Sequence, residues 1–139
     1  EEMIKKQVKD SSLGAYTTIT GFVSGDLKYG LLQDADLFVL PSYYENFGIA
    51  VAEAMGMGIP VVISDQVHIW ETVQSYNAGW VTDCTVEELT INLTAALQSE
   101  TERKERGKMA KKLVTEQYSW QAIATLMKGV YKKLSNRGN

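Results

Sequence analysis

The stretch that decides the fold is LFVLPSYYENFGIAVAEAMGMGIPVVI, residues 37–63. It opens with a continuous apolar run at residues 37–40, and a second strand-like run follows at residues 60–63. Such runs, which lack polar alternation, are typical of strands covered on both faces of a parallel sheet. Between them, residues 47–57 predict a helix, which Gly58 and Pro60 would end. Two buried strands joined by a helix predict a parallel α/β sheet.

The flanking sequence continues this alternation. Before the central stretch we expect a polar helix at residues 2–10, a strand at residues 19–23 (ITGFV) and a helix from Asp26 through Leu32. After it we expect a short helix at residues 70–75, a strand at 80–82, a helix at 85–99, another ending near Gln117, and a last helix carrying an apolar stripe from Ile123 to Leu134. Thr85 and Glu88 have the spacing of a capping box at the start of the helix at 85–99.

The composition is that of an ordinary globular domain. The 139 residues are 45% apolar and 22% charged, which suits one domain with a core of its own. A single Cys excludes an internal disulfide, and a single His excludes a multi-histidine metal centre. No apolar run approaches the roughly 20 residues of a membrane-spanning helix, and nothing at the start resembles a signal peptide. We therefore expect a cytoplasmic location.

The charges are unevenly distributed. The first 99 residues carry 13 acidic and 4 basic side chains, whereas residues 100–139 carry 4 and 10. A basic segment could contact acidic lipid or nucleic acid. The interleaved Glu102, Glu105 and Glu116 favour a helix whose charges face water, so we expect no nucleic-acid partner.

The loop after Leu40 carries the strongest chemical signal, because ligands of parallel sheets bind beyond the carboxyl ends of the strands. A helix beginning near Phe47 would leave the N–H groups of Phe47, Gly48 and Ile49 free to hold an anion. Glu45 and Glu53 would flank these amides, and carboxylates accept paired hydrogen bonds from vicinal hydroxyls. This pattern fits a ligand with a diphosphate between two sugars, which is a nucleotide sugar.

Residues 41–62 resemble the signature of retaining glycosyltransferases with the GT-B fold, and are similar to family four of these enzymes. The diagnostic feature is Glu45, seven residues, then Glu53, arranged around Phe47-Gly48 and followed by the turn Gly58-x-Pro60. Further matches are Gly21-Phe22-Val23, Glu71, Gly79 and Tyr118-Ser119-Trp120. The resemblance implies a Rossmann-like parallel sheet with helices on both faces, the C-terminal half of a GT-B fold, with C-terminal helices.

The resemblance also implies roles for single residues. Glu45 would contact hydroxyls of the donor sugar, and we assign it positioning and electrostatic stabilisation at the catalytic centre. The amides of Asn46, Phe47, Gly48 and Ile49 would approach the sugar and the diphosphate. Glu53 would bind the ribose hydroxyls of the nucleotide.

Three further candidates carry a weaker signal. The loop after Val23 lies where such enzymes hold the base, which adds Val23 and Ser24. His68 follows the strand that ends at Ile63 and would sit at the ligand edge, although a hydrogen-bonded loop histidine explains it equally well.

The activity implied is transfer of a sugar, expected to be a hexose, from a nucleoside-diphosphate sugar to an unidentified acceptor with retention of configuration. The family needs no metal, and we expect no cofactor. Two alternatives stay open. One is a non-catalytic nucleotide-binding or interaction module of the same fold. The other is part of a sugar-nucleotide epimerase, since such epimerases share the GT-B architecture.

Two other motifs have plain explanations. Asp34-Ala35-Asp36 matches the metal motif of a different glycosyltransferase fold, but here it joins a helix to a buried strand, where Asp commonly serves the turn. Cys84 and His68 could form a nucleophile and base, but no orienting third group is apparent.

The chain departs from the family pattern in two ways. Residues 66–70 (QVHIW) replace the small, glycine-rich residues usual there, which changes the expected shape of the donor-sugar pocket. In addition, nothing before Lys28 matches the Arg and Lys that grip the diphosphate, and no N-terminal acceptor-binding domain or initiating Met is present. We therefore expect residues 1–139 to be one nucleotide-sugar-binding domain, an N-terminally truncated fragment of a two-domain enzyme. A peripheral contact of that enzyme with the cytoplasmic membrane face stays open.

Overall fold

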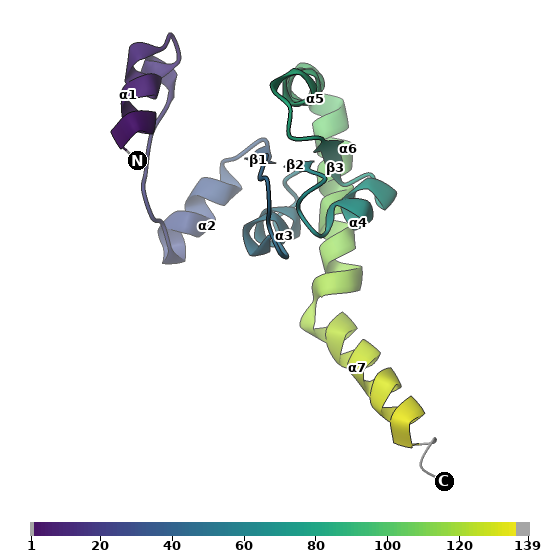
Figure 1. Ribbon diagram of the computed structural model, residues 1–139. Helices are drawn as coiled ribbons and strands as arrows, with labels where there is room; N and C mark the ends of the chain where they lie inside the picture. Colours follow the sequence, from purple (N-terminus) through teal and green to yellow (C-terminus); the bar gives the residue numbers. More distant parts are fainter. Residues whose placement is uncertain (1, 136–139) are drawn as a thin grey trace. The chain divides into compact units, whose positions relative to one another are not determined.

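The computed structural model describes residues 2–135, which fall into two compact units with a boundary after Leu31 (Figure 1). The first unit contains α1 (Glu2–Asp10), the short 3-10 helix η1 (Gly14–Tyr16) and the larger part of α2 (Gly25–Gln33). None of these three helices has a buried residue. The helices expected at residues 2–10 and from Asp26 onward are therefore present, although α2 begins one residue before Asp26.

The predicted strand at residues 19–23 is wrong. These residues form no strand, and Ile19 and Phe22 are 42% and 94% exposed. A strand needs a neighbour that satisfies its backbone N–H and C=O groups. Within the described residues, the three strands of the sheet pair only with one another. The apolar segment at residues 19–23 therefore has no neighbouring strand with which to form hydrogen bonds.

The second unit is built on a parallel sheet with the strand order β1-β2-β3. The strands are β1 (Phe38–Leu40), β2 (Val61–Ser64) and β3 (Gly79–Thr82). The helices are α3 (Ile49–Gly56), α4 (Trp70–Ser75), α5 (Val86–Gln98), α6 (Glu100–Leu113), the π-helix η2 (Val114–Tyr118) and α7 (Trp120–Ser135). The predicted strands at 37–40, 60–63 and 80–82 and the helix at 70–75 are confirmed within one or two residues at each end.

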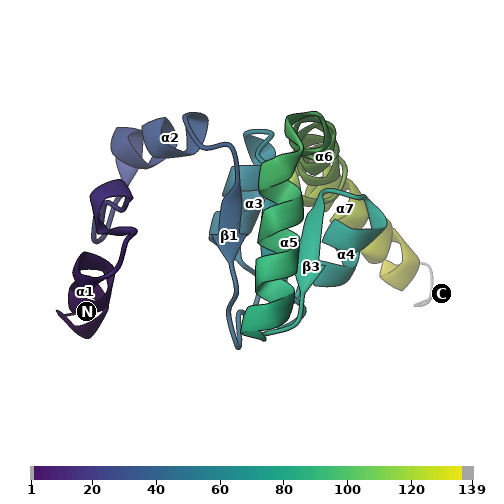
Figure 2. The ribbon, with the colours of Figure 1, turned by 90° about the horizontal axis from the view of Figure 1, so that it is seen from above.

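The side chains of β2 separate two hydrophobic layers, because successive residues of a strand point to opposite faces. Val61 and Ile63 pack in one cluster with residues of α3, α4 and α6, whereas Val62 packs with Trp80 and with Ala96 of α5. Figure 2 shows α5 on one face of the sheet and α3, α4 and α6 on the other. The prediction of a sheet with helices on both faces is confirmed.

Side-chain caps fix the two long helices that follow the sheet. The Thr85 hydroxyl accepts a hydrogen bond from the Glu88 amide at 3.3 Å, which confirms the first half of the predicted capping box. Ser99 caps α6 in the same way, by accepting from the Glu102 amide at 3.2 Å. The Arg103 guanidinium donates to the last carbonyls of α5, those of Ala96 and Leu97. Side chains thus supply partners on both sides of the junction between α5 and α6.

The predicted last helix is present as α7, but its apolar stripe does not contribute to the core. α7 has no buried residue, and Leu126 and Leu134 are 69% and 59% exposed. Periodicity shows that a helix has an apolar face, but it does not show which surface covers that face. The buried hydrophobic residues of the described chain come instead from residues 51–113. No helix among residues 2–135 has the length and apolar character needed to cross a membrane.

Two glycines allow backbone segments to approach closely. A Cβ atom on Gly107 of α6 would lie only 2.2 Å from the Gly58 carbonyl oxygen, and one on Gly79 of β3 would lie 2.2 Å from the Val61 carbonyl oxygen. Arg106, one residue before Gly107, donates to the carbonyl of Gly79 and lies with its guanidinium carbon 4.4 Å from the centre of the Trp80 ring. The packing of α6 on the sheet therefore depends on an absent side chain at Gly107.

We expect Gly107→Ala to lower the free energy of unfolding by about 2–3 kcal/mol, the upper part of the range for overpacking, because the added methyl group meets a backbone oxygen. Urea denaturation followed by far-ultraviolet circular dichroism measures it. The matched control is Gly129→Ala in α7, where a Cβ atom meets nothing within 4 Å. That variant should gain about 0.5–1 kcal/mol from helix propensity. Equal effects of the two substitutions would contradict the close-approach explanation.

Candidate functional site

The loops that follow the three strands meet at one edge of the sheet. The carbonyl oxygen of Ser42, two residues after β1, accepts hydrogen bonds from the Ser64 hydroxyl at 2.5 Å and from the Cys84 thiol at 3.3 Å. Ser64 ends β2, and Cys84 follows β3. The carboxyl ends of the parallel strands are thus tied together through a single carbonyl oxygen, at the edge where ligands of such sheets bind.

Glu45 lies beside His68 at this edge. The backbone N–H of Glu45 donates to the Gln66 carbonyl at 3.2 Å, and the N–H of His68 donates to the Glu45 carbonyl at 3.1 Å. These two bonds form an isolated parallel bridge between Glu45 and Val67. The structure therefore brings together two of the predicted site residues that are 23 positions apart, and it places the segment at residues 66–70 beside the loop that carries Glu45.

Gly48 makes the turn from this loop into α3. Its φ of +78° lies in the left-handed region, and a Cβ atom there would lie 3.1 Å from methyl groups of both Val51 and Val67. Both facts favour glycine. Gly48 itself is buried, whereas Asn46 and Ile49 are exposed.

The amides of the site differ from the expectation in one respect. Glu45 accepts a hydrogen bond from the Gly48 N–H through Oε1 at 3.3 Å, so that amide already has an anionic partner within the chain. The helix begins at Ile49, two residues later than predicted, because the left-handed backbone of Gly48 interrupts the helical geometry. The N–H groups that the helix itself cannot satisfy are consequently those of its first turn, from Ile49 onward.

Phe47 and Glu53 occupy different parts of the site. The Phe47 ring packs edge-on against Tyr118 of η2, with ring centroids 5.2 Å apart and an interplanar angle of 84°. That contact joins the loop to the Tyr118-Ser119-Trp120 segment near the C-terminus. Glu53 lies half-buried in α3, one turn after Ile49 and so on the same side of the helix.

Val23 and Ser24 belong to the first compact unit and stand in an irregular segment instead of after a strand. Their expected contact with the base stays a prediction.

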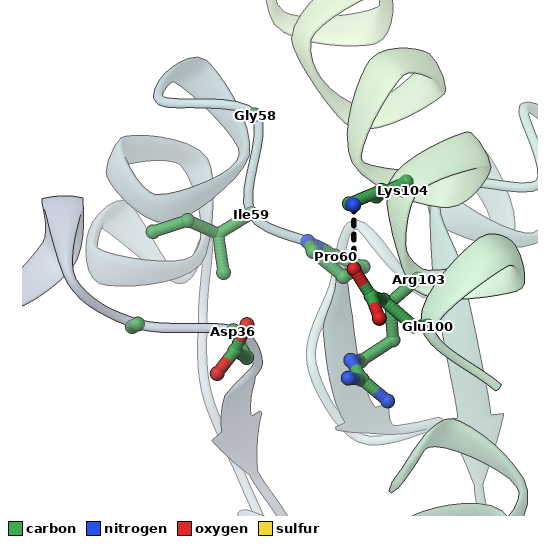
Figure 3. A pocket seen from close by; sticks show the side chains of 8 residues that line it. Asp36, Gly58, Ile59, Pro60, Glu100, Arg103 and Lys104 are labelled. Carbon is green, nitrogen blue, oxygen red and sulfur yellow. Dashed lines mark hydrogen bonds and ion pairs between the residues drawn. The ribbon is translucent and has the colours of Figure 1, made fainter. Parts of the chain in front are cut away.

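A separate cleft of about 140 Å³ lies at the opposite edge of the sheet, where β1 and β2 begin (Figure 3). Asp36 stands on one side of it and Glu100 with Lys104 on the other. The hydrogen bond from Lys104 lowers the pKa of the Glu100 carboxyl, and Arg103 is engaged by the end of α5. Because its cations already have partners, this cleft is not a candidate diphosphate site.

The Asp34-Ala35-Asp36 motif falls between α2 and β1, in the turn that the sequence indicated. Asp36 lies at the edge away from Glu45. Across residues 2–135, no group of three or more His, Cys, Asp or Glu side chains could hold a metal ion.

Sequence reasoning missed Ser42 and Ser64. Ser42 follows β1 by two residues, and Ser64 is the last residue of β2, so both stand at the carboxyl end of an apolar strand. A hydroxyl at the end of a fully buried strand must find an acceptor, and that requirement is the signal that identifies Ser64.

A sequence profile described as "Glycosyl transferases group 1" matches residues 1–113, most of the chain. The chain belongs to the glycosyltransferase group 1 family.

Individual relatives agree with this assignment. The chain is 38% identical over 113 residues to an uncharacterized glycosyltransferase of Methanocaldococcus jannaschii, covering 81% of this chain and 29% of that protein. It is 35% identical over 105 residues to the MMP alpha-(1->4)-mannosyltransferase of Mycolicibacterium hassiacum, covering 74% of this chain and 26% of that protein.

Among solved structures, the sucrose-phosphate synthase of Thermosynechococcus elongatus superimposes with a TM-score of 0.82 at 27% identity. The match covers 98% of this chain and 34% of that protein. The fold is therefore the Rossmann-like α/β fold of a GT-B C-terminal domain, as the sequence predicted. The chain spans between about a quarter and a third of the length of these three relatives.

We expect Gly48→Ala to destabilise the chain more than Gly58→Ala. Both glycines have positive φ, so each substitution incurs about 1–2 kcal/mol of left-handed strain. Only Gly48 has crowding neighbours, since a Cβ atom on Gly58 would meet nothing closer than 3.8 Å. Urea denaturation should show an additional loss of about 1 kcal/mol or more for Gly48→Ala. If Gly58→Ala proves the more harmful, the two valine contacts do not restrict the turn.

Proposed function

We propose that the chain is the nucleotide-sugar-binding domain of a retaining glycosyltransferase. The observation that carries the proposal is the bridge between Glu45 and Val67, which places the Glu45 carboxylate, His68 and the start of α3 at one edge of the parallel sheet. In the longer protein that would contain this chain, here called the parent, a second domain would bind the acceptor. In the reaction, the bond between the anomeric carbon and the diphosphate breaks, and the nucleoside diphosphate leaves. A bond from the anomeric carbon to an acceptor oxygen forms on the same face of the sugar.

The diphosphate has a natural place at the first turn of α3. The N–H groups of that turn have no helical acceptor, and the helix dipole adds partial positive charge there. Ile49, the first residue of that turn, is exposed, so the start of α3 is open to a ligand. The basic pair expected to complete the neutralisation is not found before Lys28.

Glu53 is suited to the ribose. It lies one turn into α3, on the same side as Ile49, so its carboxylate stands near the proposed diphosphate position. A carboxylate accepts from two adjacent hydroxyls, a geometry that ribose offers and a phosphate group does not. Half-burial of Glu53 makes such bonds stronger than they would be in open water.

Glu45 is suited to the donor sugar. One carboxylate oxygen, Oε1, accepts from the Gly48 N–H, which fixes the orientation of the group. Oε2 can then accept from a sugar hydroxyl, and the negative charge stabilises the electron-poor anomeric centre that develops as the diphosphate leaves. His68 lies on the neighbouring loop and adds a second polar contact to the same sugar. We further propose that the reaction needs no metal or cofactor and that the transferred group is a hexose. We also propose that the parent is cytoplasmic.

Glu53→Ala in the parent should weaken binding of the matching nucleoside diphosphate by about 1.5–3 kcal/mol, the value of hydrogen bonds to a charged group. Isothermal titration calorimetry measures the affinity. Glu87→Ala, which removes an exposed carboxylate in the first turn of α5, is the control and should bind as the wild type does. Unchanged affinity in a folded Glu53→Ala protein would refute the ribose assignment.

Glu45→Gln in the parent should lower kcat strongly, by about 100-fold or more, with nucleoside-diphosphate affinity nearly intact. The amide oxygen of Gln still accepts from the Gly48 N–H, so the substitution removes the charge and keeps the loop geometry. Glu45→Ala removes both and should also reduce stability. Steady-state kinetics with the donor, combined with calorimetry, separates these effects. Equal loss of kcat and affinity in the Gln variant, or loss of neither, would count against the role.

The chain of residues 1–139 by itself should fold but transfer no sugar. Its core of buried residues between 51 and 113 supports folding. The basic pair and the acceptor domain are absent, so a leaving diphosphate lacks counter-charge in a water-excluded site. Nucleotide binding on the order of millimolar is expected, about −4 kcal/mol. Purified chain is incubated with a panel of nucleotide sugars while nucleoside diphosphate release is followed. Turnover on the order of 1 per second would overturn this prediction.

A further inference from the structure

We propose that Ser64 is a positioning residue for the signature loop, defined as residues 41–48, and thereby for Glu45 within it. This inference rests on the proposed function, since it takes Glu45 as the group that faces the donor sugar. Ser64 itself touches no substrate in this proposal. It acts by fixing where the loop backbone stands relative to the sheet.

The first connection is a buried side-chain hydrogen bond. Ser64 ends the central strand β2 and is 0% exposed, and its hydroxyl donates to the Ser42 carbonyl across 22 positions of sequence. A buried hydroxyl without a partner is costly, so this bond selects one position of the loop backbone. Because β2 is buried along its whole length, the donor stands on a rigid part of the fold.

The second connection runs through the backbone. The carbonyl of Ser64 accepts from the Val67 N–H at 3.1 Å, which closes the turn after β2. Val67 in turn pairs with Glu45, and its methyl group faces Gly48. Ser64 therefore acts on the loop at Ser42, three residues before Glu45, and again beside Glu45 itself.

Hydrophobic packing does little to hold the intervening residues. Tyr43 and Tyr44, between Ser42 and Glu45, are each 80% exposed. The Ser42 hydroxyl shapes this turn by donating to the Tyr44 carbonyl at 2.9 Å and accepting from the Tyr44 N–H at 3.3 Å. Hydrogen bonds to Ser42 are consequently what ties this part of the loop to the sheet. Cys84 supplies the other such bond, but a thiol is a weak donor, so Ser64 dominates.

Ser64→Ala in the parent tests the proposal. The substitution removes the hydroxyl donor and changes the volume little. We expect kcat for sugar transfer to fall about 10-fold to 100-fold, as displacement of a catalytic group by about 1 Å does. Nucleoside-diphosphate affinity should stay within about twofold of wild type, because the Ser42 bond does not hold Glu53 or the first turn of α3.

Thr82→Val is the matched control. Ser64 and Thr82 are the buried polar residues among residues 2–135, and Thr82 also lies at the end of a strand. Its hydroxyl donates to the Asp83 carbonyl at 2.9 Å and not to the signature loop. Thr82→Val should therefore lower thermal stability about as much as Ser64→Ala does, with kcat close to that of wild type. Ser64→Cys, which restores a donor of similar size, should recover part of the lost kcat.

The outcomes separate the two claims. Suppose first that the wild-type parent transfers sugar. The positioning role is then overturned, while the proposed function stands, by either of two results: Ser64→Ala loses no more kcat than Thr82→Val, or Ser64→Ala loses affinity and kcat equally. Failure of Ser64→Cys to recover any kcat overturns it as well. If Ser64→Ala does not fold, Ser64→Cys replaces it, because a thiol is a weaker donor than a hydroxyl: a lower kcat at unchanged affinity supports control of the loop through Ser42, and a kcat equal to that of the wild type overturns it. If wild-type parent transfers no sugar from any nucleotide sugar, the proposed function fails and this inference fails with it.

Discussion

The burial of the central strand β2 is the constraint on which the rest of the domain depends. All four of its residues are buried, with Val61 and Ile63 directed to one helical layer and Val62 to the other. A strand buried on both faces needs neighbours on both sides, since its backbone polar groups cannot reach water. β1 and β3 supply those partners in parallel register, and parallel pairing requires a crossover helix between each pair of strands. The connections through α3 and α4 follow from that requirement.

Close packing on this sheet restricts single positions to glycine. Gly79 stands against the Val61 carbonyl, and Gly107 lets α6 approach the turn at Gly58. Arg106 then joins α6 to β3 through the Gly79 carbonyl, the Asn77 side chain and the face of the Trp80 ring. Asn77 has a φ of +54°, and the bond from Arg106 to its side chain helps to hold that turn. These contacts make the sheet and α6 a firm support for the loops at the carboxyl edge.

At the carboxyl edge of the sheet, the backbone of the loop is held in place while neighbouring residues stay exposed to solvent. Ser42, Ser64 and the bridge between Glu45 and Val67 fix the backbone of the loop, whereas Asn46, Ile49 and His68 stay exposed. A binding site benefits from this combination, because pre-organised donors and acceptors lose little entropy when a ligand arrives. The Gly48 N–H illustrates the same principle, since it orients the Glu45 carboxylate before any sugar is present.

Residues 37–63 by themselves determined the class of fold. Two continuous apolar runs and the helix between them admit few arrangements other than parallel strands with a crossover, and the capping residue Thr85 marked a helix start through a local hydrogen bond. The signature around Glu45 likewise located the candidate site, because the loop, the glycine and the helix are contiguous in sequence.

What only the tertiary structure decided were the non-local pairings. The segment at residues 19–23 has strand-like composition but no ladder partner, and α7 has an apolar face without a buried residue. The bond from Ser64 to Ser42, the bridge from Glu45 to Val67 and the engagement of the Gly48 N–H by Glu45 depend on which chain segments meet in space. Local propensity and periodicity carry no information on such meetings, because they are fixed by the packing of the whole core.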